Sequence, residues 1–270
     1  MIRIERGDLE VLLRKTQRMC NINGKPMAQV IGCVIETSPN GDLLCTTSIV
    51  RDGKTSVASF MTACEDFGGE EGVYIIPDIE KALGILKAHK GLVTLTRKED
   101  KLVFSSVGKQ TTISADPRAL AFPHTKKSVM LWHSESCERI SSIAGTGAYT
   151  LHSGEVREPF ATFELQAIDL REAIEAGNIN GQKVNRCKLI WDGQELSLEV
   201  GNDLLGKTTT QLFISESMFE PFSFAFEGGL ENCIGNSKVT LHVLDFNSEG
   251  QGYSMVITTD KGKIFQRGVM

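Results

Sequence analysis

The feature that most constrains the fold of this chain is an internal repeat, because a chain that repeats its order of elements builds one unit twice. In the first half, Leu9, Leu12, Leu13 and Thr16 have the i, i+3, i+4, i+7 spacing of a helix with one apolar face. This spacing predicts a helix over residues 8–19. Apolar segments on both sides of a Pro-Asn-Gly turn, and after an Arg-Asp-Gly turn, predict three strands after that helix.

A second helix is predicted to begin at Asp78, to carry Ile79, Leu83 and Leu86 on its apolar face, and to stop at Gly91. Three alternating segments follow it and predict a meander of strands. They are LVTLTRK, KLVFSSV and KQTTISA, with turns at Glu99-Asp100 and at Gly108.

The second half repeats this order. FATFELQ predicts a strand, and residues 169–176 predict a short helix that Gly177 ends. KLIWDGQELSLEVG then predicts a hairpin that turns at 192–193. TTTQLFIS predicts a further strand, and residues 222–236 predict the counterpart of the second helix. The residues after 236 predict a last meander of strands. Short stretches of sequence also recur, because Val93-Thr94-Leu95 and Val239-Thr240-Leu241 each open the strand after the second helix. The fold class is therefore α+β, with helices on one face of antiparallel sheets.

The repeat divides the chain into a domain over residues 1–116, a connector over 117–158 and a second domain over 159–270. The connector is rich in residues that interrupt regular structure. It holds Pro117, Pro123, Lys126, Lys127, Gly145 and Gly147.

Composition indicates an ordinary globular protein. Its 270 residues, 41% of them hydrophobic, suffice for a sizeable core. No stretch approaches the roughly 18 consecutive apolar residues of a membrane helix, and charges occupy the N-terminus where a signal peptide would be apolar. We therefore expect a cytoplasmic protein with no membrane partner. Seven scattered cysteines without a CxxC pair argue against a disulfide framework and a zinc site, and no cofactor or metal is expected.

Two repeats of two helices and a run of strands, joined by a long connector, resemble the DNA sliding clamp family. The stretch GVYIIPDIEKALGILKAHKGLVTLTRKEDKLVFSSVGKQTTISADPRALAFP is especially similar to the T4-type phage clamps. Two repeats per subunit resemble the trimeric, PCNA-like clamps of eukaryotes, archaea and such phages, since bacterial clamps carry three. The resemblance implies a viral or phage processivity factor, which would act in the host cytoplasm if phage-encoded.

The resemblance also implies how the chain assembles and what it binds. Three copies would form a homotrimer, a closed ring of six domains whose helices face duplex DNA without reading its sequence. A head-to-tail contact would cover the edge strand that each end of the subunit leaves exposed. The implied partners are a DNA polymerase, which the ring tethers, and an ATP-dependent clamp loader that opens it; the clamp itself is not an enzyme.

Basic residues on the predicted helices are the candidate DNA contacts, because cations aimed at phosphates give attraction that does not depend on sequence. In the first domain these are Arg14, Lys15, Arg18, Lys81, Lys87 and Lys90, with His89 beside them. The second domain offers only Arg171, with Lys183 and Lys188 nearby. Its helices also carry Glu172, Glu175, Glu227 and Glu231, so either some acids face a subunit interface or the first domain holds most of the DNA. A solvated face with helix C-terminal cations is the alternative for the basic residues.

The connector contains apolar residues in a loop, where they need an explanation. In clamps, the connector and a groove beside it receive short hydrophobic peptides of client proteins. By this resemblance the candidate peptide-binding residues are Ile49, Val50, Leu120, Phe122 and Pro123. A loop pinned to its own domain by these side chains is an equally good interpretation.

Other functions have weaker support. His133, Cys137 and His152 lie close enough in sequence for a thiol nucleophile and its base, but spacing alone is a weak signal. Asp66, Glu70 and Glu71 are more typical of a solvated loop than of a metal site. The main alternative to a clamp is a clamp-like structural or assembly protein, such as a viral one, that does not encircle DNA. The acidic helices of the second domain favour it.

Overall fold

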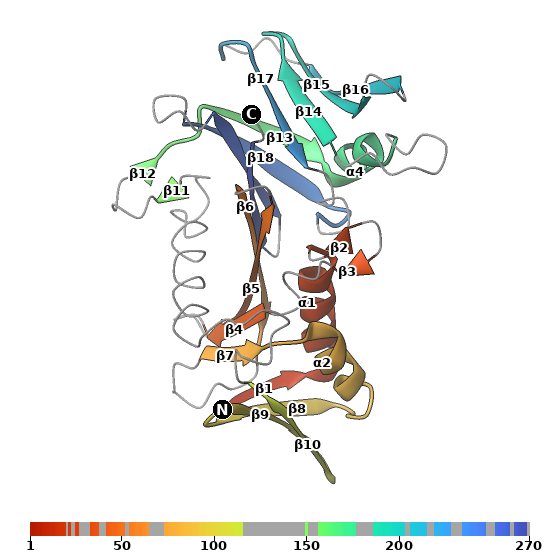
Figure 1. Cartoon of the computed structure of the whole chain (residues 1–270), viewed down its shortest axis with the longest axis vertical. Helices are drawn as coiled ribbons and strands as arrows, with labels where there is room; N and C mark the ends of the chain where they lie inside the picture. The colour runs from red at the N-terminus through yellow and green to blue at the C-terminus, as the bar shows by residue number, and fades with distance from the viewer. Residues whose placement is uncertain are drawn as a thin grey trace. The chain divides into compact units, whose positions relative to one another are not determined.

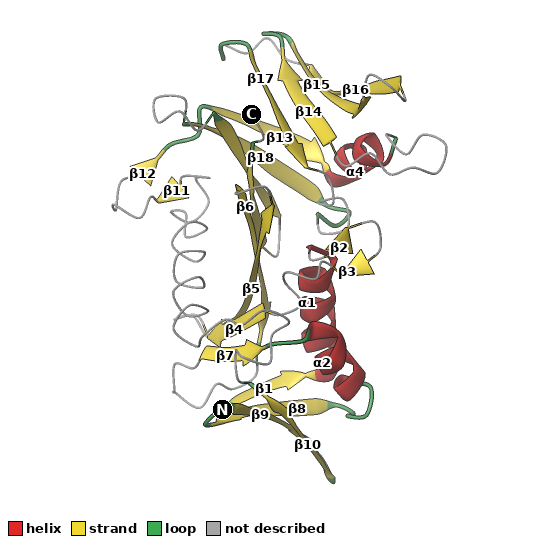
Figure 2. Ribbon diagram, viewed as in Figure 1, coloured by secondary structure: helices red, strands yellow, loops and turns green. Residues whose placement is uncertain are grey.

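The computed structural model of the chain is shown in Figures 1 and 2. It describes residues 1–19, 21–22, 25–26, 33–37, 42–51, 54–64, 73–115, 149–150, 156–176, 186–202, 206–214, 219–227, 234–246, 252–259 and 262–268. The chain forms two compact units, Met1–Ile49 with Val57–Cys137, and Val50–Ser56 with Glu138–Met270. Most of the predicted connector lies outside the described residues, so the predicted bounds of the domains and the connector stay a prediction.

The first unit begins with a strand that the sequence analysis missed, β1 (Ile2–Glu5), which runs directly into α1 (Arg6–Met19). Ile2 and Ile4 alternate with charged residues and are fully or almost fully buried, as expected of a strand with one face in the core. The strand belongs to an antiparallel sheet of order β1-β8-β9-β10. Its other members are β8 (Leu92–Lys98), β9 (Lys101–Ser106) and β10 (Lys109–Ser114).

The predicted meander is confirmed, and its turns form where they were expected. Glu99, with a positive φ of 51°, joins β8 to β9, and Gly108, with a φ of 70°, joins β9 to β10. Such left-handed backbone is what two-residue hairpin turns require.

Four further strands, most of whose residues belong to the first unit, neighbour one another in the order β6-β5-β4-β7. They are β4 (Cys33–Thr37), β5 (Asp42–Arg51), β6 (Lys54–Ala63) and β7 (Val73–Ile76). A small ladder pairs β2 (Asn21–Ile22) with β3 (Lys25–Pro26).

The helix α2 (Ile79–Leu86) follows β7, and Asp78 caps it by accepting a 2.9 Å hydrogen bond from the Lys81 backbone N–H. It ends before the predicted stop at Gly91. Ala88 and His89 donate backbone hydrogen bonds to Ile85 and Leu86, which tightens the chain into a closing turn. Lys87 is therefore the C-terminal cap, and Lys90 lies beyond the helix.

The second unit also starts with a strand that runs into a helix, β13 (Ala161–Gln166) and α4 (Ala167–Glu175). Within this unit, β13 neighbours three later strands in the order β13-β18-β19-β20. The other strands are β18 (Lys238–Asp245), β19 (Tyr253–Thr259) and β20 (Gly262–Arg267). A two-residue ladder, β11 (Tyr149–Thr150) with β12 (Val156–Arg157), precedes them.

A sheet within this unit has the order β16-β15-β14-β17. Its strands are β14 (Arg186–Trp191), β15 (Glu195–Asn202), β16 (Gly206–Ile214) and β17 (Phe222–Glu227). The predicted hairpin at 192–193 is confirmed, because Asp192 accepts hydrogen bonds from the backbone N–H groups of Gln194 and Glu195.

The predicted helix over 222–236 is wrong at both described ends, because residues 222–227 form the strand β17 and residues 234–236 are not helical. Phe222, Phe224 and Phe226 alternate with small or polar residues and are all buried, which is the period of a strand. They join an aromatic core in which Phe163 packs against Trp191 with a ring-centroid distance of 5.2 Å. Residues 228–233 lie outside the described part of the chain.

The two units repeat one topology, which confirms the predicted tandem duplication. In each unit a first strand, β1 or β13, runs into a helix. The next four long strands neighbour one another as β6-β5-β4-β7 in one unit and as β16-β15-β14-β17 in the other. The last three strands, β8 to β10 or β18 to β20, then pair beside the first strand. Figure 2 shows α1 and α2 in red in the first unit and α4 in red in the second.

Candidate nucleic-acid interface

The outward face of α1 is basic, and the packing of the helix explains why. Leu9, Leu12, Leu13 and Thr16 are each at most 2% exposed and hold the opposite face against the core, as predicted. Arg14 is thereby left exposed and Lys15 half-exposed, on the solvent side of the helix. Arg18 lies on the last turn of α1, and its side chain is not among those described.

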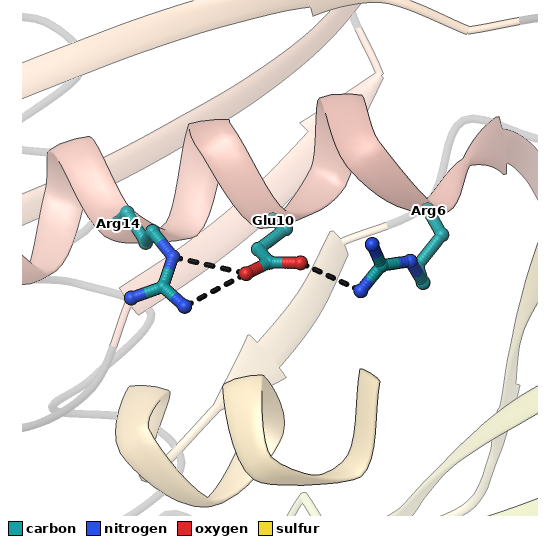
Figure 3. Close-up of polar contacts among 3 residues, drawn as sticks. All are labelled: Arg6, Glu10 and Arg14. Atoms are coloured by element: carbon teal, nitrogen blue, oxygen red, sulfur yellow. Dashed lines mark hydrogen bonds and ion pairs between the residues drawn. The ribbon is translucent and has the colours of Figure 1, made fainter. Parts of the chain in front are cut away.

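Two residues that the sequence analysis did not single out join Arg14 in an ion-pair cluster, which we call the Glu10 triad. Glu10 accepts a 2.7 Å hydrogen bond from Arg6 Nη1 on one carboxylate oxygen. Its other oxygen accepts from Arg14 Nε at 3.0 Å and from Arg14 Nη2 at 2.7 Å. Figure 3 shows the carboxylate between the two guanidinium groups along one side of the helix. The i, i+4, i+8 spacing of residues 6, 10 and 14 was the available signal.

The charges around Glu10 affect its titration. The hydrogen bond from Arg14, aided by the positive charges of Arg6, Arg14 and Lys87, outweighs partial burial and lowers the pKa of Glu10. Because Lys87 belongs to the cap of α2, the triad lies on the side of α1 that faces this neighbouring helix.

The second helix extends the basic surface. α1 and α2 pack against each other, and Figure 1 shows them side by side within the first unit. Ile79, Ala82, Leu83 and Leu86 are buried, whereas Lys81, Lys87 and Lys90 are all exposed. Arg14 and Lys15 of α1 and the three lysines in and after α2 are thus solvent-accessible on two packed helices, and we call these five residues the basic helix surface.

His89 does not belong to this surface, which corrects the expectation that it lies beside the lysines. Its side chain is 1% exposed, with Nδ1 2.9 Å from Ser106 Oγ and Nε2 3.1 Å from Thr111 Oγ1. Burial lowers the pKa of His89, and the charge of Lys109 lowers it further. The ring therefore links the end of α2 to β9 and β10 in its neutral form.

The second unit offers no comparable basic helix in the part of the chain that is described. α4 carries one basic residue, Arg171, and three acidic ones, Asp169, Glu172 and Glu175, which are all exposed. Arg171 Nη1 donates a 2.5 Å hydrogen bond to Asn236 Oδ1. Lys188 is on β14 rather than on a helix, opposite Glu199 in the sheet register. Lys183 and Glu231 lie outside the described residues, and Glu227 ends the strand β17.

The remaining candidate residues are placed only in part. Ile49 and Val50 are in β5, but their side chains are not described, and Leu120, Phe122 and Pro123 lie outside the described residues. The same is true of His133, Cys137 and His152, and of Asp66, Glu70 and Glu71. Within the described ranges, no group of His, Cys, Asp or Glu has the arrangement of a metal site. No helix among the described residues is long and apolar enough to cross a membrane.

Comparison with known proteins gives structural matches only. No protein-family model matches the chain, and no curated protein matches its sequence. A Helicobacter pylori beta clamp matches with a TM-score of 0.66 and 18% identity over 100% of this chain and 63% of that chain. The beta subunit of the DNA polymerase of Streptococcus pyogenes matches with a TM-score of 0.64 and 11% identity, over 99% and 65%. A Helicobacter pylori beta clamp bound to a DNA ligase peptide matches with a TM-score of 0.61 and 16% identity, over 99% and 66%. The chain thus spans about two thirds of the length of these clamps.

Proposed function

Because this chain has the sliding-clamp fold, we propose that it is a clamp subunit, a non-catalytic processivity factor that encircles duplex DNA and tethers a replicative polymerase. The observation that carries this proposal is the basic helix surface. Two packed helices present Arg14, Lys15, Lys81, Lys87 and Lys90 on the solvent side of one unit. Cations at this density attract phosphates regardless of sequence, which permits sliding.

The first unit makes most of the DNA contact in this proposal. α1 carries four basic and two acidic residues, whereas α4 carries one basic and three acidic residues. Arg171 and Lys183 then add little, and Lys188 adds nothing because it is on a sheet.

A homotrimeric, PCNA-like or T4-type ring is the finer form of the proposal. Two clamp repeats per chain, each of one topology, need three copies to supply the six domains of a ring. In its own unit, β10 is the last strand of one sheet and β16 the last strand of another. An exposed apolar side chain lies near one end of each strand: Val107, in the turn before β10, has a relative exposure of 103%, and Ile214, the last residue of β16, has 67%. Antiparallel pairing of β10 with β16 of a neighbouring copy would bring these two side chains together.

Client binding is proposed from the same likeness. One of the matching clamps holds a DNA ligase peptide, and another is named as a subunit of a DNA polymerase. By analogy, Ile49, Val50, Leu120, Phe122 and Pro123 would receive the hydrophobic peptides of a polymerase and other clients, and an ATP-dependent loader would open the ring.

Two measurements test the proposal. Light scattering should give a mass near three times the 29.6 kDa of one chain. Duplex binding at low salt should weaken about tenfold when Arg14 and Lys87 are both replaced by Gln, and the slope of log K against log salt should fall by about two. The control is Lys101→Gln, which removes one positive charge from the strand β9. It should change the duplex affinity and the salt slope little.

The alternative is a clamp-like structural or assembly protein that does not encircle DNA, and the exposed acids Glu172 and Glu175 of α4 favour it. A single-chain mass, or duplex binding that the Arg14 and Lys87 substitutions leave unchanged, would support this alternative over the clamp.

A further inference from the structure

Glu10 is a carboxylate within a surface that is otherwise suited to attract phosphate. Its side chain is 18% exposed, whereas the paired side chains of Arg6 and Arg14 are 35% and 46% exposed. The carboxylate therefore lies deeper than the guanidinium groups that it holds, and both arginines stay accessible from solvent.

The geometry of the Arg14 contact gives this carboxylate a specific effect. Arg14 directs Nε and Nη2, the two donors of one edge of its guanidinium, to one oxygen of Glu10. This is an edge through which arginine binds a phosphate with two parallel hydrogen bonds. A phosphate that uses this edge must displace Glu10. When the phosphate dissociates, the hydrogen bonds between Arg14 and Glu10 form again.

We propose that Glu10 is a positioning residue that competes with DNA phosphate for Arg14, and through its other oxygen for Arg6, so that each phosphate contact is weak and exchanges rapidly. This inference rests on the proposed DNA contact of α1. Beyond that contact, Glu10 would limit the affinity of the chain for DNA, because a protein that slides must exchange its phosphate contacts rapidly. The lowered pKa of Glu10 keeps the competing charge present throughout the neutral range.

The test compares two single substitutions on one helix. Glu10→Gln removes the competing charge and releases Arg6 and Arg14, whereas Asp8→Asn removes the same charge from an exposed position in the first turn of α1, outside the Glu10 triad. Binding of each variant to a short duplex is measured by fluorescence anisotropy over a series of salt concentrations, with helicity checked by circular dichroism. Glu10→Gln should bind about two- to fivefold more tightly than the unchanged protein, with a salt slope steeper by about one. Asp8→Asn should leave the slope unchanged.

A double-mutant cycle separates competition from a general change of charge. In an Arg14→Gln background, Glu10→Gln should gain less affinity, because only Arg6 is left to release. Equal effects of Glu10→Gln and Asp8→Asn, or an effect of Glu10→Gln that Arg14→Gln does not reduce, would overturn the competition while leaving the DNA contact in place. An unchanged protein that binds no duplex even at low salt would instead refute the proposed function and this inference with it.

Discussion

Val239 lies opposite Leu165 in the antiparallel pairing of β13 with β18, the place that Val93 takes opposite Ile4 in the pairing of β1 with β8. All four side chains are buried, so the same contact closes the core of each unit. Because the strand before the helix and the strand after it are joined at equivalent residues in both units, the sequence repeat is a structural one.

The Glu10 triad makes the stability of the first unit sensitive to acid. A carboxyl group whose folded pKa is lowered stabilises the fold above its unfolded pKa, about 4.3 for glutamate, and loses this effect as the pH falls through the folded value. Glu10→Gln should therefore melt at a lower temperature than the unchanged protein at neutral pH and at the same temperature near pH 2. Melting curves followed by circular dichroism measure this. A difference that is constant over the whole pH range would show that the ion pairs do not titrate as described.

His89 should destabilise the first unit in mild acid. Its folded pKa is lowered, so the unfolded chain takes up the proton first, and stability is lost as the pH falls below about 6.5. Between about pH 7.5 and about pH 5.5, the melting temperature of the unchanged protein should fall by a few degrees more than that of His89→Asn. The other buried histidine with a described contact, His242, is present in both proteins, so its effect cancels. Parallel pH profiles would contradict the burial of a neutral His89.

Replacing each of two glycines, one within α2 and one after it, by alanine should change the free energy of unfolding in opposite directions. Gly84 is within the helix, and a methyl group added there would meet nothing within 4 Å, so Gly84→Ala should raise the free energy of unfolding by about 0.5–1 kcal/mol. Gly91 has equal space but a φ of +59°, where a side chain is strained, so Gly91→Ala should lower it by about 1 kcal/mol. Urea unfolding measures both. Effects of the same sign would place the end of α2 elsewhere.

The proposed contact between copies depends on the exposed apolar residues at the strand ends. Ile214→Lys puts a charge where β16 would meet Val107 of the next copy and should reduce the mass in solution to that of one chain. Val11→Lys is the matched control, an exposed apolar residue of α1 changed in the same way, and it should leave the mass unaltered. An unaltered mass for Ile214→Lys as well would exclude this edge from the assembly.

The sequence predicted the fold where a pattern was long and periodic. The structure confirms the apolar stripe of Leu9, Leu12 and Leu13 and the hairpin turns at Glu99 and Asp192. Only two apolar residues, Ile2 and Ile4, mark the strand β1, which is too short a pattern to predict a strand. At β17 the repeat predicts a helix, whereas the alternating phenylalanines favour the strand that the structure has.

The candidate site was predicted less well than the fold. Exposed cations such as Arg14 and Lys87 could be identified from the helical period alone. The pairing of Arg14 with Glu10 and the burial of His89 depend on the packing of α1 and α2 and on tertiary hydrogen bonds, which the spacing of residues does not determine.

Topological capture on DNA tests the encirclement of duplex most directly. The protein is allowed to thread onto a linear duplex, both ends are then blocked with streptavidin on terminal biotin, and the complex is washed with high salt. A closed ring should remain on the blocked duplex and should leave once a restriction enzyme cuts the DNA, because screening removes phosphate attraction but not a topological link. Loss of the protein in the same wash from blocked and unblocked duplex alike would contradict the account.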